Sequence, residues 1–310
     1  MTNDTRDFIS LADYTREELQ ALLDLAVRLK ASLRAGRPEK RLSGKVLGCI
    51  FHKPSLRTRL SFEVAMRQLG GDSLYITDAE IGFGKRESIY DIGQVTSRFL
   101  DGIMIRTFDH AKVVELAQAA PSPVINGLTD SEHPCQVFSD LFTVKERGLP
   151  LDGIKVAYLG DGNNLVHSWL TAAMAFHFDF TFGGPEGFDP SPAFLDRARA
   201  RAKGKIVISR DPAEAVRGAQ VIYTDTWTSM GQEAEAEKRA RVFPPFQVNA
   251  KLLALADPKA IVMHCLPAHR GQEITDEVMD GPQSVVFDQA ENRLHGQKAI
   301  LVRCLGAPTN

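Results

Sequence analysis

The sequence predicts an α/β fold with two doubly wound parallel sheets and a C-terminal helix that packs back on the first domain. Short apolar stretches alternate with amphipathic stretches along the whole chain, a pattern typical of parallel strands covered by helices on both faces. A chain of 310 residues is long enough for about two domains. A long helical pattern ends at Gly148-Leu149-Pro150, so we predict a first domain over residues 1–148 and a second over residues 149–310.

The first half opens with a long helix. Thr15 and Glu18 form a capping box, and the leucines that follow recur at helical spacing. The predicted strands of this half are residues 45–51, 73–77, 102–106 and 123–127, and its further helices are residues 60–69, 87–99, 111–119 and 134–147.

The second half repeats the alternation. Its predicted strands are residues 155–160, 179–184, 205–209, 220–225, 260–265 and 284–288, and its first helix is residues 165–176. A last helix, at about residues 289–304, is expected to return to the first domain.

The composition limits the partners and the location. Hydrophobic residues make up 44% and charged residues 25%, with a net charge of −2, so the chain lacks the basic excess of proteins that bind nucleic acid or anionic membranes. No apolar run is long enough to span a bilayer, and the N-terminal segment lacks the apolar core of a signal peptide. Four scattered cysteines without a CxxC pair disfavour a disulfide framework or structural zinc. We therefore predict a reduced, cytoplasmic protein with a small-molecule partner.

The first stretch that carries chemistry is His52-Lys53-Pro54-Ser55-Leu56-Arg57-Thr58-Arg59, between a predicted strand and a helix. Two hydroxyls, two arginines and the free N–H groups of a helix N-terminus suit a phosphate dianion. An ordinary helix cap with surface arginines would show the same residues.

The second stretch is Asp130-Ser131-Glu132-His133-Pro134-Cys135-Gln136. His133 and Gln136 lie three residues apart at a helix start and therefore share a face. Both side chains can donate to a carbonyl oxygen or an amide, although a histidine in this place is often structural.

Two further stretches follow predicted strands of the second half, where ligands bind in open parallel sheets. Asp225, followed by the turn Ser229-Met230-Gly231, can hold an ammonium group, or can cap a helix. The other stretch runs from His264 to Gly271.

In that last stretch, Pro267 biases Leu266 away from the right-handed helical region, which turns the chain beside Cys265. Cys265 is either reactive or an inert thiol. His264 and His269 lack a third ligand at a spacing typical of metal sites, which disfavours a metal.

The Gly160-Asp161-Gly162-Asn163-Asn164 segment occupies the place of a dinucleotide loop. Leu165 interrupts the G-x-G-x-x-G pattern, which disfavours a nicotinamide-dependent enzyme.

The four stretches, in this order, resemble the aspartate/ornithine carbamoyltransferase family from about Phe8 to Leu305. Cys135, where aspartate-type members commonly have threonine, and the Ser229-Met230-Gly231 turn resemble the ornithine-type branch. The resemblance implies transfer of the carbamoyl group of carbamoyl phosphate to the δ-amine of L-ornithine, giving L-citrulline and phosphate. It implies a carbamoyl phosphate domain followed by an ornithine domain, and no metal or organic cofactor, because the leaving group is already activated.

The resemblance also implies roles for individual residues. Arg57, His133 and Cys265 are the implied catalytic residues; Cys265 either accepts a proton or orients the attacking amine. The implied carbamoyl phosphate set is Ser55, Leu56, Arg57, Thr58, Arg106, His133, Gln136, Cys265, Leu266 and Arg293. The implied ornithine set is Asn164, Asp225, Ser229 and Met230. Members of the family form trimers or multiples of trimers, and we expect the same here.

Two positions depart from the family pattern. Leu56 replaces a common threonine, so only its backbone N–H is left for phosphate. Gly82 stands where several members carry a glutamine or histidine that reaches a neighbouring subunit.

Two alternative functions stay open: a carbamoyltransferase for acylated ornithine or putrescine, and a non-enzymatic anion-binding protein on the same fold.

Overall fold

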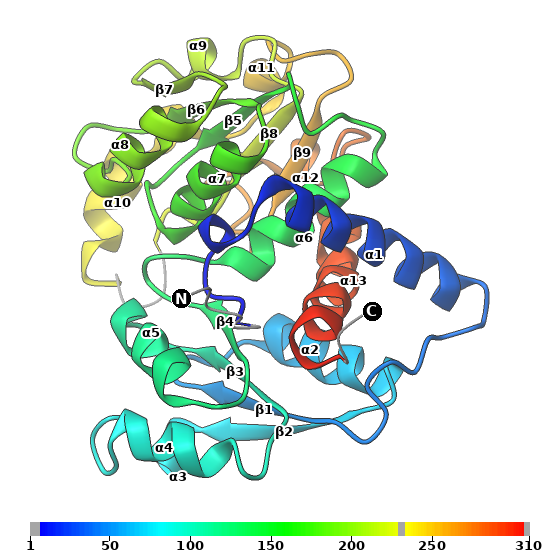
Figure 1. Ribbon diagram of the computed structural model, residues 1–310. Helices are drawn as coiled ribbons and strands as arrows, with labels where there is room; N and C mark the ends of the chain where they lie inside the picture. The colour runs from blue at the N-terminus through cyan, green and yellow to red at the C-terminus, as the bar shows by residue number, and fades with distance from the viewer. Residues whose placement is uncertain (1–6, 229–232, 307–310) are drawn as a thin grey trace. The chain divides into compact units, whose positions relative to one another are not determined.

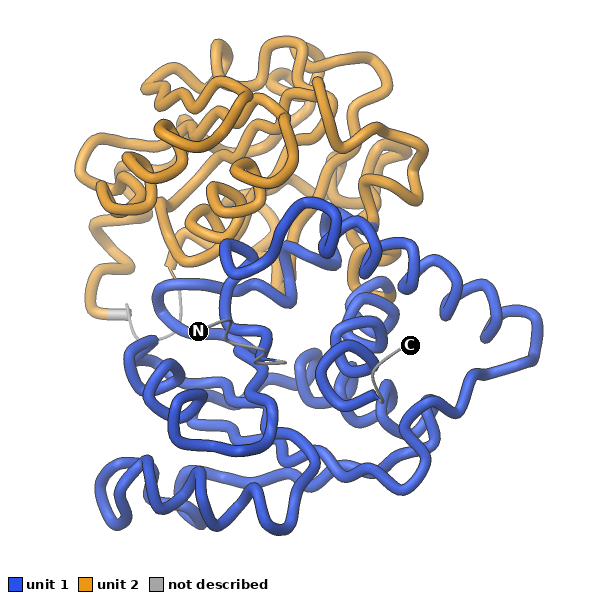
Figure 2. The backbone as a smooth tube through the Cα atoms, in the orientation of Figure 1, with its two compact units in different colours: residues 1–142, 292–310 blue, residues 143–291 orange. Residues whose placement is uncertain are grey.

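The computed structural model describes residues 7–228 and 233–306 (Figure 1). It confirms the predicted α/β class, because the strands form a four-stranded sheet in the order β2-β1-β3-β4 and a five-stranded sheet in the order β7-β6-β5-β8-β9. Every pair of neighbouring strands is parallel. Contacts divide the chain into unit 1, residues 1–142 and 292–310, and unit 2, residues 143–291 (Figure 2). The domain boundary predicted at residue 148 stays a prediction.

The sheet of unit 1 consists of β1 (Val46–Phe51), β2 (Asp72–Thr77), β3 (Gly102–Arg106) and β4 (Val124–Leu128). Strand β3, one of the two central strands, is buried along its whole length, as expected for a strand covered on both faces.

The helices assigned to unit 1 include the long α1 and most of α13. Thr15 caps α1 and forms the predicted capping box with Glu18. The helices are α1 (Arg16–Arg34), α2 (Leu56–Gln68), α3 (Asp78–Ile81), α4 (Ile89–Thr96), α5 (His110–Ala119), α6 (Pro134–Glu146) and α13 (Val286–Leu305), with α6 and α13 crossing the unit boundary. In Figure 1, α13 (red) lies beside α2.

The sheet of unit 2 consists of β5 (Lys155–Leu159), β6 (Asp179–Gly183), β7 (Ile206–Ser209), β8 (Val221–Thr224) and β9 (Ile261–His264). Its helices are α7 (Asn164–Ala175), α8 (Pro192–Arg201), α9 (Pro212–Val216), α10 (Ala236–Val242), α11 (Ala250–Leu253) and α12 (Asp276–Met279). No helix in the described ranges is long and apolar enough to cross a membrane.

Three expectations about elements need correction. The strand predicted at residues 284–288 is wrong: Ser284 makes one isolated bridge to Val262, and α13 then begins at Val286. A short apolar run does not distinguish a strand from the first turn of a buried helix. The helix predicted from about residue 60 begins at Leu56, because Ser55 caps it. The helix predicted over residues 87–99 is limited to α4, and the short α3 was not predicted.

Each sheet has a topological switch point, where the strand order reverses. It lies between β1 and β3 in unit 1, and between β5 and β8 in unit 2. Ligands of open α/β sheets bind outside the carboxyl ends of the strands at these points. The motifs around Ser55 and Arg106 follow β1 and β3, and those around Asn163 and Asp225 follow β5 and β8. The topology therefore predicts one ligand site in each unit.

Candidate active site

The site of unit 1 starts at the N-terminus of α2. Ser55 is in an extended conformation, and its hydroxyl accepts from the N–H of Thr58 at 3.3 Å. Leu56 is the first helical residue, with an exposed side chain. The first N–H groups of a helix have no partner within the helix and carry partial positive charge. This end of α2 is therefore suited to an anion.

Two buried guanidinium groups converge on Thr58. The Thr58 Oγ1 atom lies 2.8 Å from Nη2 of Arg293, on α13, and 3.5 Å from Nη1 of Arg106, the last residue of β3. Arg106 and Arg293 are 9% and 3% exposed. Two guanidinium groups that lie this close together give the site a positive charge, which suits a phosphate dianion. The structure thus brings Ser55, Thr58, Arg106 and Arg293 together; their role in binding carbamoyl phosphate stays a prediction.

His133 and Gln136 lie at the start of α6. The His133 carbonyl accepts from the N–H groups of Gln136 and Val137, which starts the helix. The Gln136 amide nitrogen donates to Asp140, at 2.8 Å, while its Oε1 is buried and has no hydrogen-bond partner among the described residues. A buried, unsatisfied acceptor is rare; an amide N–H of a ligand would satisfy it.

The His133 ring is neutral near neutral pH. Burial is the main cause, and the guanidinium groups of Arg293 and Arg106 add to it, so that the pKa of His133 lies well below its usual range. A neutral imidazole keeps one N–H donor and one acceptor nitrogen. It can therefore donate to a carbonyl oxygen without adding a full charge.

This lowered pKa predicts a pH dependence of stability. As the pH falls through about 6.5, His133 of the unfolded chain binds a proton that the native ring does not bind. The free energy of unfolding therefore decreases as the pH is lowered. Between neutral and mildly acidic pH, we expect the thermal unfolding midpoint to fall less for His133→Gln than for the wild type, as measured by calorimetry. His269→Gln, at a half-exposed histidine of unit 2, is the control; equal losses for wild type and His133→Gln would contradict the prediction.

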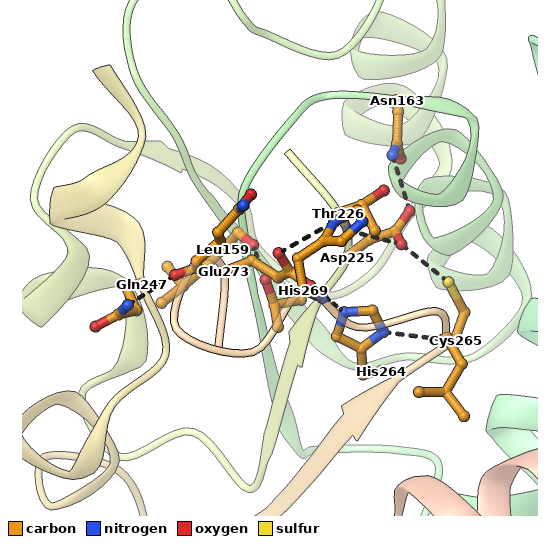
Figure 3. Close-up of polar contacts among 12 residues, drawn as sticks. Leu159, Asn163, Asp225, Thr226, Gln247, His264, Cys265, His269 and Glu273 are labelled. Carbon is orange, nitrogen blue, oxygen red and sulfur yellow. Dashed lines mark hydrogen bonds and ion pairs between the residues drawn. The ribbon is translucent and has the colours of Figure 1, made fainter. Parts of the chain in front are cut away.

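The site of unit 2 centres on the carboxylate of Asp225, which follows β8 (Figure 3). Asn163 caps α7 through its Oδ1, and its Nδ2 donates to Asp225 Oδ2 at 3.1 Å. The Cys265 thiol donates to Asp225 Oδ1 at 3.1 Å, and the N–H of Thr226 donates to the same oxygen at 2.8 Å. Asp225 is buried, so this carboxylate is held in one orientation by three donors.

The turn after Cys265 is held by a buried histidine–glutamate pair. The N–H of Leu266 donates to His264 Nδ1 at 2.9 Å, which leaves the proton on Nε2 to donate to Glu273 Oε1 at 3.0 Å. Glu273 Oε1 also accepts from the N–H of His269. Leu266 has φ of 61°, a region that a leucine rarely occupies. The pair therefore fixes a strained turn that carries Cys265 beside Asp225.

Asp225, His264 and Cys265 form a group whose donor atoms all lie within 4.8 Å of one another. Both ring nitrogens of His264 are already bonded within the turn, and the thiol is bonded to Asp225. These internal bonds explain the cluster without a metal ion.

Cys265 differs from the other three cysteines. Cys49, Cys135 and Cys304 are buried, whereas Cys265 is partly exposed. Burial raises the pKa of Cys49, and raises that of Cys135 to about 12. Because the thiolate is the nucleophile, we expect iodoacetamide to alkylate Cys265 first, detected by peptide mass spectrometry, with Cys265→Ala as the control. Alkylation of Cys135 at the same rate would contradict this expectation.

The other predicted site residues lie at several places in the chain. Asn164 is the first residue of α7, and it is the neighbouring Asn163 that bonds Asp225. Ser229 and Met230 lie outside the described residues. Arg57 is half-buried on the first turn of α2. Gly82 ends α3 in the left-handed region, with φ of 56°, which provides a local reason for glycine there.

Sequence reasoning missed two residues of the site of unit 2. Asn163 is one of them; its place directly before a helix is a sequence signal for a cap. Glu273 had no signal, because its pairing with His264 depends on the turn between them.

Comparisons with known proteins identify the class of this fold and site. Residues 6–146 match the model described as the carbamoyl-P binding domain of aspartate/ornithine carbamoyltransferase, and residues 152–304 match its Asp/Orn binding domain. The chain therefore belongs to the aspartate/ornithine carbamoyltransferase family.

Individual relatives are named more specifically. The chain is 56% identical to the ornithine carbamoyltransferase of Symbiobacterium thermophilum, over 96% of each chain, and 52% identical to that of Brucella suis, over 98% of each. It matches the structure of the Pyrococcus furiosus ornithine carbamoyltransferase with a TM-score of 0.94 and 47% identity over 98% of each chain. The Thermus thermophilus enzyme matches with a TM-score of 0.88 and 45% identity, over 97% of this chain and 99% of that one.

Proposed function

We propose that this protein is an ornithine carbamoyltransferase, an enzyme that transfers the carbamoyl group of carbamoyl phosphate to the δ-amine of L-ornithine. The main observation behind this proposal is the match, over nearly the whole chain and at more than 50% sequence identity, to proteins of that name. The reaction yields L-citrulline and phosphate. The charges of the two sites support the proposal, because Arg106 and Arg293 in unit 1 suit a phosphate and Asp225 in unit 2 suits an ammonium group.

Unit 1 is proposed to hold carbamoyl phosphate. Ser55, Thr58, the N–H of Leu56 and the guanidinium groups of Arg106 and Arg293 would bind the phosphoryl oxygens. This proposal is supported by the meeting of Thr58 with both buried arginines.

The carbamoyl end of the same ligand would meet His133, Gln136 and Arg57. Donation from His133 and Arg57 to the carbamoyl oxygen would stabilise the negative charge that develops there in the tetrahedral transition state. The buried Oε1 of Gln136 would accept from the carbamoyl NH₂ group. The backbone of Leu266 and the side chain of Cys265 are proposed to contact the carbamoyl group as well.

Unit 2 is proposed to hold ornithine. The Asp225 carboxylate would bind the α-ammonium, with Asn164, Ser229 and Met230 completing the ornithine set. The Asn163 side chain would keep Asp225 in place.

The chemical step is an addition followed by an elimination. The neutral δ-amine forms a bond to the carbamoyl carbon, the carbonyl electrons move to oxygen, and the bond to the phosphate oxygen then breaks. The amine nitrogen must lose one proton. Cys265 is proposed either to orient the amine or to accept that proton, and the departing phosphate is an alternative acceptor of sufficient basicity.

An assay of the purified protein tests the proposal. We expect citrulline from carbamoyl phosphate and L-ornithine, detected by colorimetry, and much less product from N-acetylornithine or putrescine. A preference for either alternative amine would redirect the assignment within the family. Absence of product with all three amines would favour an anion-binding protein on the same fold.

Assembly and location are further proposals. We propose a homotrimer, which sedimentation would reveal as a mass near three times that of the 34.2 kDa chain. We also propose a cytoplasmic role in arginine metabolism, which loss of arginine prototrophy on gene deletion would support.

A further inference from the structure

Arg293 reaches the proposed phosphate site of unit 1 from α13, the last helix of the described residues. It lies on α13, while Thr58, its partner at 2.8 Å, lies on the first turn of α2. The position of Arg293 therefore depends on how α13 is held in unit 1.

A second polar contact joins the same two helices. The Lys298 ammonium, on α13, donates to Oε1 of Gln68, the last residue of α2, at 2.8 Å. Thus α13 contacts α2 at both ends of α2: Arg293 at the start and Lys298 at the end. Lys298 is only 2% exposed, whereas Gln68 is partly exposed, so the bond joins a buried ammonium to an amide at the edge of the interior.

The chemistry of this contact is unusual for an interior position. Among the described residues, the hydrogen-bond partner of Lys298 is a neutral amide, and burial lowers the pKa of Lys298 to about 8. Burying an ammonium without a counter-charge opposes folding. A methionine would occupy similar space without that penalty. Stability alone therefore does not explain a lysine here.

A buried lysine also fixes α13 next to Arg293. Lys30, on α1, donates to Oδ1 of Asn292 at 2.6 Å. Asn292 directly precedes Arg293, and Lys298 lies five positions after it. These two hydrogen bonds, one on each side of Arg293 along the helix, restrict sliding and rotation of α13.

We propose that Lys298 is a positioning residue for the proposed phosphate site. Its bond to Gln68 holds α13 against α2 and thereby keeps Arg293 in contact with Thr58. The importance of this positioning for catalysis rests on the proposed function. The positioning itself is tested by anion binding, which does not require turnover.

The main experiment compares Lys298→Met with the wild type. Inorganic phosphate, titrated by calorimetry, is expected to bind about 2- to 30-fold more weakly to the variant, the range for residues that act through others. The KM for carbamoyl phosphate should rise by a similar factor, while the KM for ornithine at saturating carbamoyl phosphate stays unchanged. The thermal midpoint at pH 7 should be equal or higher, since a buried charge is removed.

Two further variants isolate the contact. Gln68→Leu removes the acceptor and should also weaken phosphate binding, and Lys298→Met/Gln68→Leu should be no worse than Lys298→Met alone. Arg67→Met changes the neighbouring exposed residue of α2, and should leave phosphate affinity unchanged.

The outcomes separate the two proposals. Unchanged phosphate affinity in Lys298→Met, or a lower midpoint with both KM values shifted alike, would overturn the positioning role. If the wild type forms no citrulline, yet phosphate binding weakens in Lys298→Met, the proposed function fails and the positioning role stands.

Discussion

Replacing Asp225 with asparagine is expected to weaken ornithine binding about 10- to 160-fold while leaving carbamoyl phosphate binding unchanged. The range corresponds to the roughly 1.5–3 kcal/mol of a hydrogen bond to a charged group. Asparagine keeps the shape of the side chain but loses the negative charge that the α-ammonium needs. Because the thiol of Cys265 and the amide of Asn163 both donate to Asp225, the change also removes one acceptor from that network.

The measurement is calorimetric titration with ornithine and, separately, with inorganic phosphate. Asp196→Asn, at an exposed aspartate of α8 in the same unit, is the matched control and should bind ornithine as the wild type does. If phosphate binding weakens in Asp225→Asn as much as ornithine binding, the assignment of Asp225 to the amino acid is wrong.

Replacing Arg57 with alanine is expected to lower kcat by about a hundredfold, since loss of one preorganised donor to a developing oxyanion removes roughly 3 kcal/mol of transition-state stabilisation. Arg57 lies on the first turn of α2, beside the N-terminus that we propose binds phosphate. The effect should therefore appear mainly in kcat under saturating substrates, with the thermal midpoint close to that of the wild type.

Arg59 provides the control for Arg57. It lies two residues further along the same helix, is exposed, and forms a 2.7 Å ion pair with Glu63. Arg59→Ala should keep kcat within a few-fold of the wild type. A normal kcat in Arg57→Ala, with the fold intact, would rule out its catalytic role.

The sequence predicted the sites best where neighbouring residues carry the chemistry. Ser55 and Thr58 were identifiable because a cap and a hydroxyl follow a strand directly. The strand order then explains why Arg106, distant in sequence, meets Thr58: β1 and β3 are adjacent in the sheet. The alternation of strands and helices predicted the fold class for the same local reason.

Local patterns failed where tertiary contacts decide the outcome. Val286 lies in a run that suits a strand, but after one bridge the chain becomes α13. The bond between His264 and Glu273 depends on a left-handed leucine at position 266, which no propensity predicts. The buried amine of Lys298 looks in the sequence like any surface lysine of an amphipathic helix.

The assignment of the last part of α13 to unit 1 has a consequence for synthesis of the protein. Translation makes residues 1–142 first, but this stretch lacks Arg293, which belongs to the same unit. The proposed anion site of unit 1 is thus finished only after all of unit 2, residues 143–291, has been synthesised. A ligand that binds only the folded state stabilises that state by mass action, so we expect carbamoyl phosphate or phosphate to protect chains that include Arg293 but not shorter nascent chains. Chains truncated before position 293 would lack this protection and would remain open to proteolysis.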